Sequence, residues 1–245
     1  MPFADLPSHI SCASNAGAYA FPMAEHVLAM TLSLAKRLSI EQQKLQRGEF
    51  DDRTLNRSLR GMKAGIVGFG GAGRATARLM RAFGMSIYAL NQSGKSDEPT
   101  DFIGTLRDLE HVLRVSDVIV ITIPLTKVTK GLIGEKELVW MKQDAILINV
   151  ARGAILDEAT LYTHLQTHPT FQAGIDTWWE EPLRGGTFRM AFPFLDLPNV
   201  LGSPHNSALV PEVIGDAARQ AAQNIKRFLN GEKVMGSIKR EDYLE

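Results

Sequence analysis

The stretch that decides the fold is Lys63–Met80, KAGIVGFGGAGRATARLM. Its order of residues predicts a buried β-strand, a glycine-rich turn and the start of a helix. Gly68, Gly70 and Gly73 have the spacing G-x-G-x-x-G, which lets the chain turn sharply, bring its backbone close to a pyrophosphate and pack helix against strand. Free N–H groups at the start of such a helix face the phosphates. The stretch therefore predicts a dinucleotide-binding turn.

Composition narrows the class of protein. The 245 residues contain 27 Lys and Arg against 27 Asp and Glu, with no basic run or charged tail, so neither nucleic acid nor a membrane surface is expected as the main partner. Cys12 is alone, which excludes an internal disulfide framework and is typical of a reducing compartment. The most apolar segment, residues 23–38, is interrupted by charges near both ends and is too short to cross a membrane. We expect a cytoplasmic protein without a signal peptide.

Apolar runs and helical patterns alternate along the rest of the chain. Strands that are apolar on both faces and separated by helices indicate a parallel sheet covered on both sides. The predicted fold class is α/β, a Rossmann-type doubly wound parallel sheet with helices on both faces. After the first strand we expect strands at residues 86–90, 117–123, 145–149, 172–176 and 199–202, and helices at 106–115, 134–141 and 157–168.

Two further helices lie outside this alternation. Residues 23 to about 46 predict one long helix that is apolar around much of its circumference, so it needs cover on several sides, from this domain and from another domain or subunit. Residues 211–230 predict a final amphipathic helix, and the only possible strand before residue 20 is at 10–12. We expect a dinucleotide-binding domain at residues 21–210, with residues 1–20 and 211–245 outside it.

Polar residues follow four of the predicted strands, and ligands bind at the carboxyl ends of strands in this architecture. Arg152, Asp176, Glu181 and His205 should meet at this edge if the sheet is parallel. An arginine holds a substrate carboxylate with its planar fork of donors. A histidine exchanges the proton that accompanies hydride transfer, and a neighbouring carboxylate orients its ring.

Other conspicuous residues have an ordinary structural interpretation. Trp178 and Trp179 are expected to fill the core and its rim. Glu25 and His26 are interpreted as a polar pair at a helix end that holds two domains together. The histidines outside the candidate site show no ligand-like pairing, so no metal site is expected.

The order of these motifs resembles the D-isomer-specific 2-hydroxyacid dehydrogenases, the family of D-glycerate, D-lactate and phosphoglycerate dehydrogenases. The resemblance covers residues 14–230 and is closest to a glycerate-dehydrogenase-like branch. It rests on Ala24-Glu-His26, Gly68 to Gly73, Phe83-Gly-Met85, Pro124-Leu-Thr126 with Thr129 and Gly131, Asn149-Val-Ala-Arg-Gly153, Asp176 with Glu181-Pro182, and Ser203-Pro-His205.

The resemblance implies roles at the matching positions. Arg152 would bind the carboxylate and carbonyl oxygen of a 2-oxo acid, and His205 would be the general acid or base with Glu181 as its partner. The N–H groups of Gly71 and Ala72 would face the pyrophosphate, and Asp176 would lie near the nicotinamide amide. The implied cofactor-binding residues are Gly68, Gly70, Gly71, Ala72, Gly73, Asn91, Pro124, Thr129, Ala151 and Asp176.

The chain departs from the family at the end of its second strand. The acidic residue that usually holds the adenine ribose there is Asn91 in this chain. A carboxylate would repel the extra phosphate of NADP and an amide does not, yet no arginine follows Asn91 to bind that phosphate. We expect NAD or NADP as the cofactor, with a slight preference for a site that tolerates NADP.

The largest departure is in the family's flavodoxin-like substrate domain of about a hundred residues. Most of this domain is expected to be absent, with residues 1–20 and 211–245 as its remnants. That domain closes over the cofactor in the family, and such closure excludes water and completes the catalytic set. The final helix is therefore expected to keep an uncovered apolar face.

The sequence predicts a nicotinamide-dependent oxidoreductase of small 2-hydroxy and 2-oxo acids, such as glyoxylate or hydroxypyruvate. It is expected to be a homodimer through the helix at 23–46 and the arm that follows. The main alternative is a dinucleotide-binding module or sensor without turnover, as in corepressors built on the same scaffold. A weaker alternative is another enzyme with an NAD domain, such as an alanine dehydrogenase or a homocysteine hydrolase.

Overall fold

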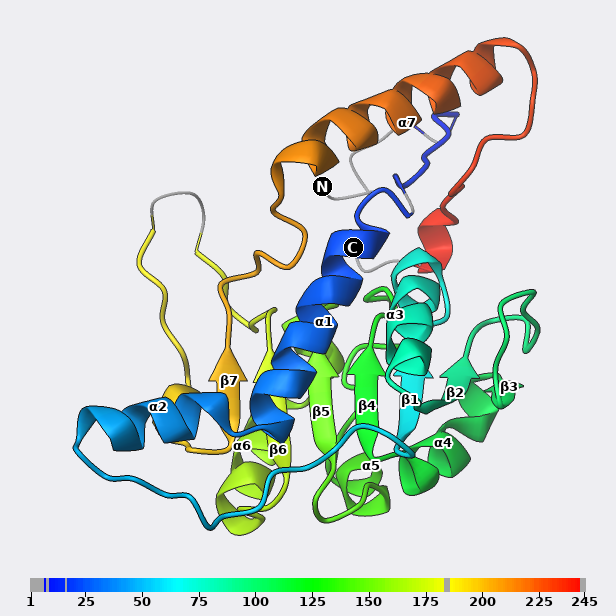
Figure 1. Cartoon of the computed structure of the whole chain (residues 1–245). Coiled ribbons are helices and arrows are strands. Elements are labelled where there is room, and N and C mark those ends of the chain that lie inside the picture. Colours follow the sequence, from blue (N-terminus) through cyan, green and yellow to red (C-terminus); the bar gives the residue numbers. More distant parts are fainter. Residues whose placement is uncertain (1–6, 8, 16, 183–185, 243–245) are drawn as a thin grey trace.

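The computed structural model describes residues 7, 9–15, 17–182 and 186–242, and its centre is a seven-stranded sheet (Figure 1). All neighbouring strands pair in parallel, in the order β3-β2-β1-β4-β5-β6-β7. The strands are β1 Lys63–Val67, β2 Ser86–Leu90, β3 Phe102–Gly104, β4 Val118–Ile121, β5 Ile146–Asn149, β6 Gln172–Ile175 and β7 Val200–Gly202. The α-helices are α1 Ala20–Ala35, α2 Leu38–Gln46, α3 Gly71–Ala82, α4 Leu109–Val115, α5 Glu135–Trp140, α6 Glu158–Thr167 and α7 Pro211–Leu229.

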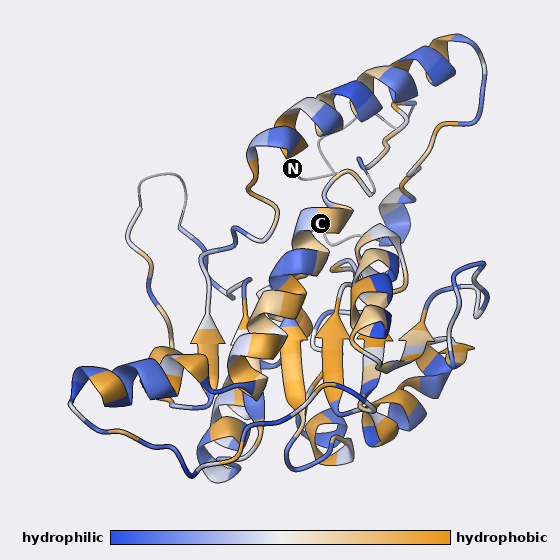
Figure 2. Ribbon diagram, viewed as in Figure 1, coloured by the Kyte–Doolittle hydropathy of each residue, from blue (hydrophilic) through white to orange (hydrophobic). Residues whose placement is uncertain are grey.

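Helices cover both faces of the sheet because successive side chains of a strand point to opposite faces. In β4, Val118 and Val120 pack with α1 and α3 in one buried cluster. Ile119 and Ile121 pack with α4, α5 and α6 in the other. Figure 2 shows the strands as a hydrophobic layer between these helices. The predicted α/β fold, a doubly wound parallel sheet, is confirmed.

The edge strand β3 was not predicted from the sequence. It has three residues and pairs with β2 through Tyr88 and Phe102. A run this short shows no alternation in the sequence, and its pairing depends on β2 being already in place. The possible strand at 10–12 is wrong, since these residues form no strand and the nearest bridge is an isolated antiparallel one between Ala13 and Ser237.

The long helix predicted at 23–46 is broken into α1 and α2. Arg37 lies between them with φ 56, in the left-handed region. The carbonyl of Ala35, which residue 39 would need to continue the helix, accepts the N–H of Arg57 at 2.9 Å instead. Arg37 then pairs with Glu41 at 2.8 Å in the first turn of α2. The returning chain therefore takes the carbonyl that a continuous helix would use.

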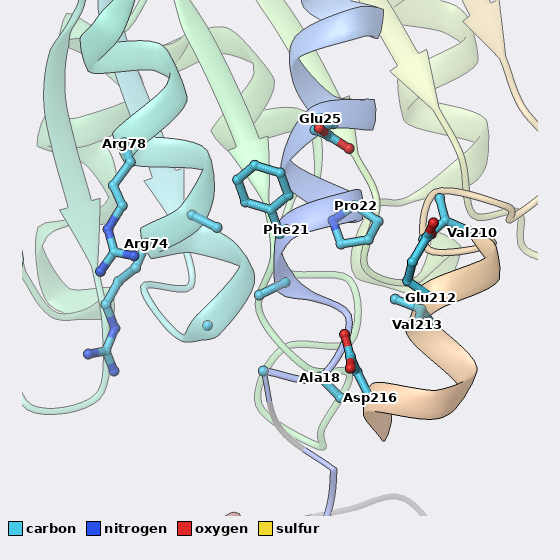
Figure 3. Close-up of a pocket in the computed structure, with 14 residues that line it drawn as sticks. Ala18, Phe21, Pro22, Glu25, Arg74, Arg78, Val210, Glu212, Val213 and Asp216 are labelled. Carbon is cyan, nitrogen blue, oxygen red and sulfur yellow. The ribbon is translucent and has the colours of Figure 1, made fainter. Parts of the chain in front are cut away.

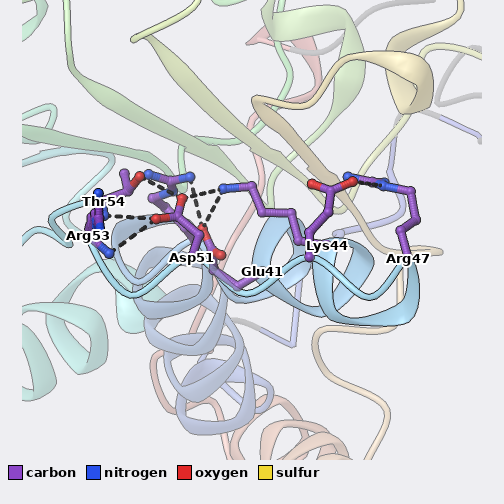
Figure 4. A network of polar contacts seen from close by, with 8 residues as sticks. Glu41, Lys44, Arg47, Asp51, Arg53 and Thr54 are labelled. Carbon is purple, nitrogen blue, oxygen red and sulfur yellow. Dashed lines mark hydrogen bonds and ion pairs between the residues drawn. The ribbon is translucent and has the colours of Figure 1, made fainter.

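We call residues 38–57 the arm. Its turn is held by Asp51, whose carboxylate accepts from Lys44 Nζ at 2.6 Å and from Thr54 Oγ1 at 2.6 Å (Figure 4). The lysine, then the threonine, keep the pKa of Asp51 well below its usual range. No residue of α2 is buried, and large apolar side chains of the arm are exposed at positions 38, 45, 50 and 55. The arm is thus ordered internally but stands away from the core.

The predicted final helix is confirmed as α7, which lies apart from the sheet (Figure 1). It exposes Ile214, Ile225, Phe228 and Leu229. The segment after it returns to the start of the chain, where the Ser14 N–H donates to the Gly236 carbonyl at 2.8 Å. Within the described part of the chain, none of the helices has both the length and the apolar character needed to cross a membrane.

Candidate functional site

The glycine-rich turn joins β1 to α3 where the strand order reverses, between β1 and β4. Gly68 has φ +107, and a Cβ on it would lie 2.6 Å from the carbonyl carbon of Thr122, so only glycine fits. The Thr122 hydroxyl donates to the Gly68 carbonyl at 2.6 Å. A Cβ on Gly73 would collide with that same carbonyl. These contacts fix the turn at the edge of the sheet where ligands bind in this architecture.

The first turn of α3 offers donors to an anion. Its first backbone bond of the helical pattern runs from the Arg74 N–H to the Gly70 carbonyl at 3.0 Å, so the N–H groups of Gly71, Ala72 and Gly73 have no acceptor within the helix. A Cβ on Gly70 would meet no described atom within 4 Å. The turn therefore combines open space with free donors, which suits a pyrophosphate.

The end of β2 forms a small pocket beside this turn. Asn91 Oδ1 accepts from the Gly94 N–H at 2.7 Å, and its Nδ2 donates to the Lys95 carbonyl at 2.8 Å. The pocket has a volume of about 270 Å³, and its lining also includes Ser93, Lys95 and Arg74. The expectation that no arginine serves this position is wrong, because Arg74 reaches it from α3.

The loop after β4 carries Pro124 and Thr129. The Thr129 hydroxyl donates to the Pro124 carbonyl at 2.7 Å and accepts from the Thr126 N–H at 2.8 Å. Thr129 is buried, so its polar atom is used within the loop. The structure places this loop beside the glycine turn, since Thr122 joins the two.

The loop after β5 carries Arg152 and is shaped by Asn149. This buried amide donates to the Arg152 carbonyl at 3.0 Å and accepts from the Ala151 N–H at 3.1 Å. Arg152 itself is exposed, and its Nη1 donates to the Ala151 carbonyl at 2.6 Å. None of the described carboxylates forms an ion pair with it, so its guanidinium is available to an anionic ligand.

The loop after β6 carries Glu181, and the loop after β7 carries His205. Glu181 Oε2 lies 2.7 Å from His205 Nδ1, and its Oε1 accepts from the Trp178 N–H at 3.0 Å. The carboxylate therefore fixes the ring from one side. No described residue hydrogen-bonds Nε2, so this nitrogen is left for a ligand. The structure brings together the acid–base pair predicted from the sequence.

Asp176 is fully buried at the end of β6. Its Oδ1 accepts from the Ser203 hydroxyl at 2.6 Å and from the Asn206 N–H at 3.1 Å, and its Oδ2 from the Ser207 N–H at 3.3 Å. Burial alone would raise the pKa of Asp176, but these hydrogen bonds and the nearby His26 outweigh it and lower the pKa. The carboxylate is thus ionised and holds the loop of His205.

His26 is a member of this group that the sequence analysis did not place there. Its Nε2 lies 2.9 Å from Ser203 Oγ and 3.6 Å from Asp176 Oδ1. The sequence analysis expected the pair Glu25 and His26 to hold two domains together, but the partners of His26 follow strands of the central sheet. The motif Ala24-Glu25-His26 was the available signal, but nothing in the sequence joins it to residues so distant along the chain.

Trp178 and Trp179 pack as predicted. The Trp178 indole N–H donates to the Ser203 carbonyl at 2.9 Å, and that of Trp179 to the Leu156 carbonyl at 2.7 Å. Trp179 also stacks on Phe194, with ring centroids 5.2 Å apart. The two indoles join the loops after β6 and β7 to the core.

A larger cavity of about 600 Å³ lies between α1, α3 and α7 (Figure 3). Arg74 and Arg78 project from α3 on one side, and Glu25, Glu212 and Asp216 come from the opposite side. Arg78 is paired with Glu98, whereas Arg74 has no ion pair with a described residue. Arg74 thus stands between this cavity and the pocket beside Asn91.

Comparison with known proteins gives a consistent result. A family model described as "D-isomer specific 2-hydroxyacid dehydrogenase, NAD binding domain" matches residues 28–207. A glyoxylate reductase of Aeropyrum pernix is 33% identical in an alignment of 248 positions that covers 95% of this chain and 72% of that protein. A glyoxylate reductase of Thermococcus kodakarensis is 37% identical over 172 residues, which cover 70% of this chain and 50% of that protein. The chain therefore spans about half the length of this second relative.

A solved structure supports the same assignment. The D-isomer specific 2-hydroxyacid dehydrogenase from Xanthobacter autotrophicus Py2, in complex with NADPH and MES, matches with a TM-score of 0.83 and 27% identity. The match covers 96% of this chain and 94% of that chain. The family match includes the glycine turn, Arg152, Glu181 and His205. This chain therefore belongs to the D-isomer specific 2-hydroxyacid dehydrogenases and contains their NAD-binding domain.

Proposed function

We propose that this chain is an NAD(P)-dependent oxidoreductase that transfers a hydride between the nicotinamide and a small 2-hydroxy or 2-oxo acid. The substrate would be of the glycerate, hydroxypyruvate or glyoxylate type. The observation that carries the proposal is the pair of Glu181 and His205, joined at 2.7 Å on the same edge of the sheet as the glycine turn. A sensor of cofactor concentration has no need of this pair.

The chain's own residues can handle the proton of such a reaction. With Nδ1 of His205 directed at Glu181, Nε2 can give a proton to the carbonyl oxygen in reduction and take it back in oxidation. Glu181 is itself fixed by the Trp178 N–H, so the ring is oriented before a substrate arrives. A bound nicotinamide supplies or accepts the hydride.

Arg152 is the proposed binding group for the substrate. Its guanidinium is exposed and makes only a hydrogen bond to the Ala151 carbonyl among the described residues. A carboxylate beside a carbonyl offers two coplanar oxygens, which match the fork of donors on an arginine. A small 2-oxo acid would thus be held with its carbonyl toward His205.

The residues at the glycine turn fit a dinucleotide, and those beside Asn91 support NADP. A 2′-phosphate would find Arg74 and Lys95 on the walls of the 270 Å³ pocket, with the Ser93 hydroxyl as a further donor. Asp97 is a carboxylate in that lining, which weakens the preference without reversing it. The NADPH complex of the Xanthobacter relative supports the same choice.

We further propose a cytoplasmic homodimer formed through α1 and the arm. The exposed apolar side chains of the arm, Leu38, Leu45, Phe50 and Leu55, support this interface because such side chains favour burial in a partner. The proposed dinucleotide domain is residues 21–210, and residues 1–20 and 211–245 belong to the substrate domain. The balanced charge and the single Cys12 support the compartment.

One observation favours the alternative of cofactor binding without turnover. Arg152 and His205 are both exposed, and hydride transfer is more effective in a site that excludes water. A protein that only senses the cofactor would use the glycine turn and leave the acid–base pair idle. The two functions therefore differ in whether a bound cofactor is turned over, and only the enzyme requires His205.

The test is a cofactor titration followed by a turnover assay. NADH and NADPH binding would be measured by calorimetry, and then glyoxylate and hydroxypyruvate would be added while the absorbance of the reduced cofactor is followed. The enzyme predicts turnover that falls about 10²- to 10⁴-fold in His205→Gln with cofactor affinity intact. Binding without turnover supports the sensor. Failure of both cofactors to bind would refute the proposal.

A further inference from the structure

His205 lies in an unfavourable backbone conformation. Its φ is 51, in the left-handed region, and Arg37 is the only other residue with a Cβ that shares this feature in the described part of the chain. A Cβ makes that region costly, so contacts around the residue must compensate. The contacts that hold this backbone conformation therefore also set the direction of the His205 ring.

Asp176 makes those contacts through three successive backbone N–H groups. Its backbone carbonyl accepts from the His205 N–H at 2.8 Å. Its Oδ1 and Oδ2 accept from the N–H groups of Asn206 at 3.1 Å and Ser207 at 3.3 Å. The loop is therefore wrapped around one buried side chain. If the carboxylate turned away, two of these three donors would lose their acceptor.

The orientation of Asp176 is in turn held by a chain of donors from α1. An ionised carboxylate only accepts hydrogen bonds, so the Ser203 hydroxyl must give its hydrogen to Asp176 Oδ1, 2.6 Å away. Ser203 Oγ is then the acceptor toward His26 Nε2 at 2.9 Å, and this nitrogen must carry a hydrogen. The hydrogen-bond directions therefore run from His26 to Ser203 to Asp176.

This order also excludes a hydrolase-like triad among the same three residue types. In such a triad the histidine accepts the hydroxyl hydrogen and thereby activates the serine oxygen. Here Ser203 gives its hydrogen to the carboxylate, and His26 donates to the serine. His26, Ser203 and Asp176 therefore stabilise the conformation of the loop and do not activate the serine.

We propose that His26, acting through Ser203, is a positioning residue for His205. It orients the Ser203 hydroxyl, which fixes the Asp176 carboxylate, which in turn holds residues 205–207 in the backbone conformation that presents the ring of His205 to Glu181. The relevance to catalysis rests on the proposed function, but the structural claim does not.

The first test needs no variant and no turnover. In the 15N-labelled protein, long-range correlations of the His26 ring show which nitrogen carries the hydrogen when the ring is neutral. We expect it on Nε2. A ring with its hydrogen on Nδ1 alone would overturn the proposal, because Nε2 could not then donate to Ser203.

The second test uses matched variants and amide hydrogen exchange in the cofactor-free protein. Ser203→Ala and His26→Leu remove a donor, whereas Ser203→Thr and His26→Gln retain one. We expect exchange at the amides of residues 205–207 to accelerate about tenfold or more in the first pair and to stay near wild type in the second. Equal exchange in all four folded variants would overturn the proposal.

Turnover then separates this proposal from the proposed function. If wild type turns over 2-oxo acids, His26→Leu should lower kcat and leave KM for the acid within about twofold, since Arg152 is not part of the chain of donors. A wild type that binds NADPH without turnover would refute the enzyme and leave the exchange result to decide the role of His26.

Discussion

Replacement of Gly153 by alanine tests how the candidate site is assembled. Gly153 is where the loop of Arg152 touches the loop that leads to Glu181. A Cβ there would lie 2.6 Å from both the Trp178 carbonyl oxygen and the Trp179 amide nitrogen, 0.8 Å inside the 3.4 Å at which ordinary contact begins. Because both atoms are backbone, neither can rotate away, and the two loops must separate.

The expected cost follows from this overlap. Overpacking of a dense region typically costs about 1–3 kcal/mol of stability. Separation by roughly an ångström would move Arg152 relative to Glu181, and a misplacement of that size can lower a rate about 10²-fold. NADPH affinity should fall much less than turnover, since the glycine turn and the pocket beside Asn91 are formed by other segments of the chain than the two loops that meet at Gly153.

The assay compares Gly153→Ala with Gly134→Ala. At Gly134 the nearest described atom to a built Cβ is Glu137 Oε2 at 3.6 Å, an ordinary contact, so this control changes composition without steric overlap. Turnover of glyoxylate, NADPH affinity by calorimetry and the midpoint of urea unfolding would be measured for both. If Gly153→Ala matched Gly134→Ala in turnover and unfolding midpoint, the close approach of the two loops would be refuted.

Three further predictions concern other parts of the chain. Burial, and then the charge of His168, lower the pKa of His164 from 6.5 to about 4. As pH falls from about 6.5 to 4, His164 therefore takes up a proton in the unfolded chain before it does so in the folded one. The free energy of unfolding should drop in that window by about 1–2 kcal/mol, after allowance for the partial exposure of the ring. Urea unfolding at several pH values should show a smaller drop in His164→Gln. Arg74→Ala should weaken NADPH binding about tenfold or more and leave NADH nearly unchanged, as measured by calorimetry. Asp51→Asn should loosen the arm, because it weakens the bond to Lys44, and limited proteolysis should show faster cleavage within the arm at an unchanged melting temperature.

The fold could be predicted because its central strands are apolar on both faces. All four residues of β4 are buried, two in each core cluster. A continuous apolar run of this kind is typical of a strand in a parallel sheet that is covered on both faces. The edge strand β3 could not be predicted, since three residues paired on one side carry too little pattern. The break at Arg37 could not be predicted either, because the N–H group that donates to the Ala35 carbonyl belongs to Arg57, which lies far along the chain.

The proximity of Glu181 and His205 could be predicted because they follow parallel strands, whose carboxyl ends meet at one edge. His26 and Arg74 could not be placed in the same way. His26 is 177 residues from Ser203 and reaches it from a helix. Arg74 precedes Asn91 in the chain and reaches the pocket from α3, whereas the family pattern points to residues that follow Asn91. Strand order locates residues at strand ends, but it does not say which helix side chains reach them.

The three loops that carry Arg152, Glu181 and His205 are joined to one another by contacts within this chain. Gly153 packs on the backbone of Trp178, and Trp178 donates from its backbone to Glu181 and from its indole to the Ser203 carbonyl. Glu181 then fixes the ring of His205. Each loop is thus held by its neighbour through contacts within this chain, and these contacts include those that orient the proposed acid–base pair. What the exposed Arg152 and His205 still lack is cover from water. If the proposed enzyme function is correct, an element that closes over these two side chains should raise the rate by excluding solvent around a pair that is already aligned.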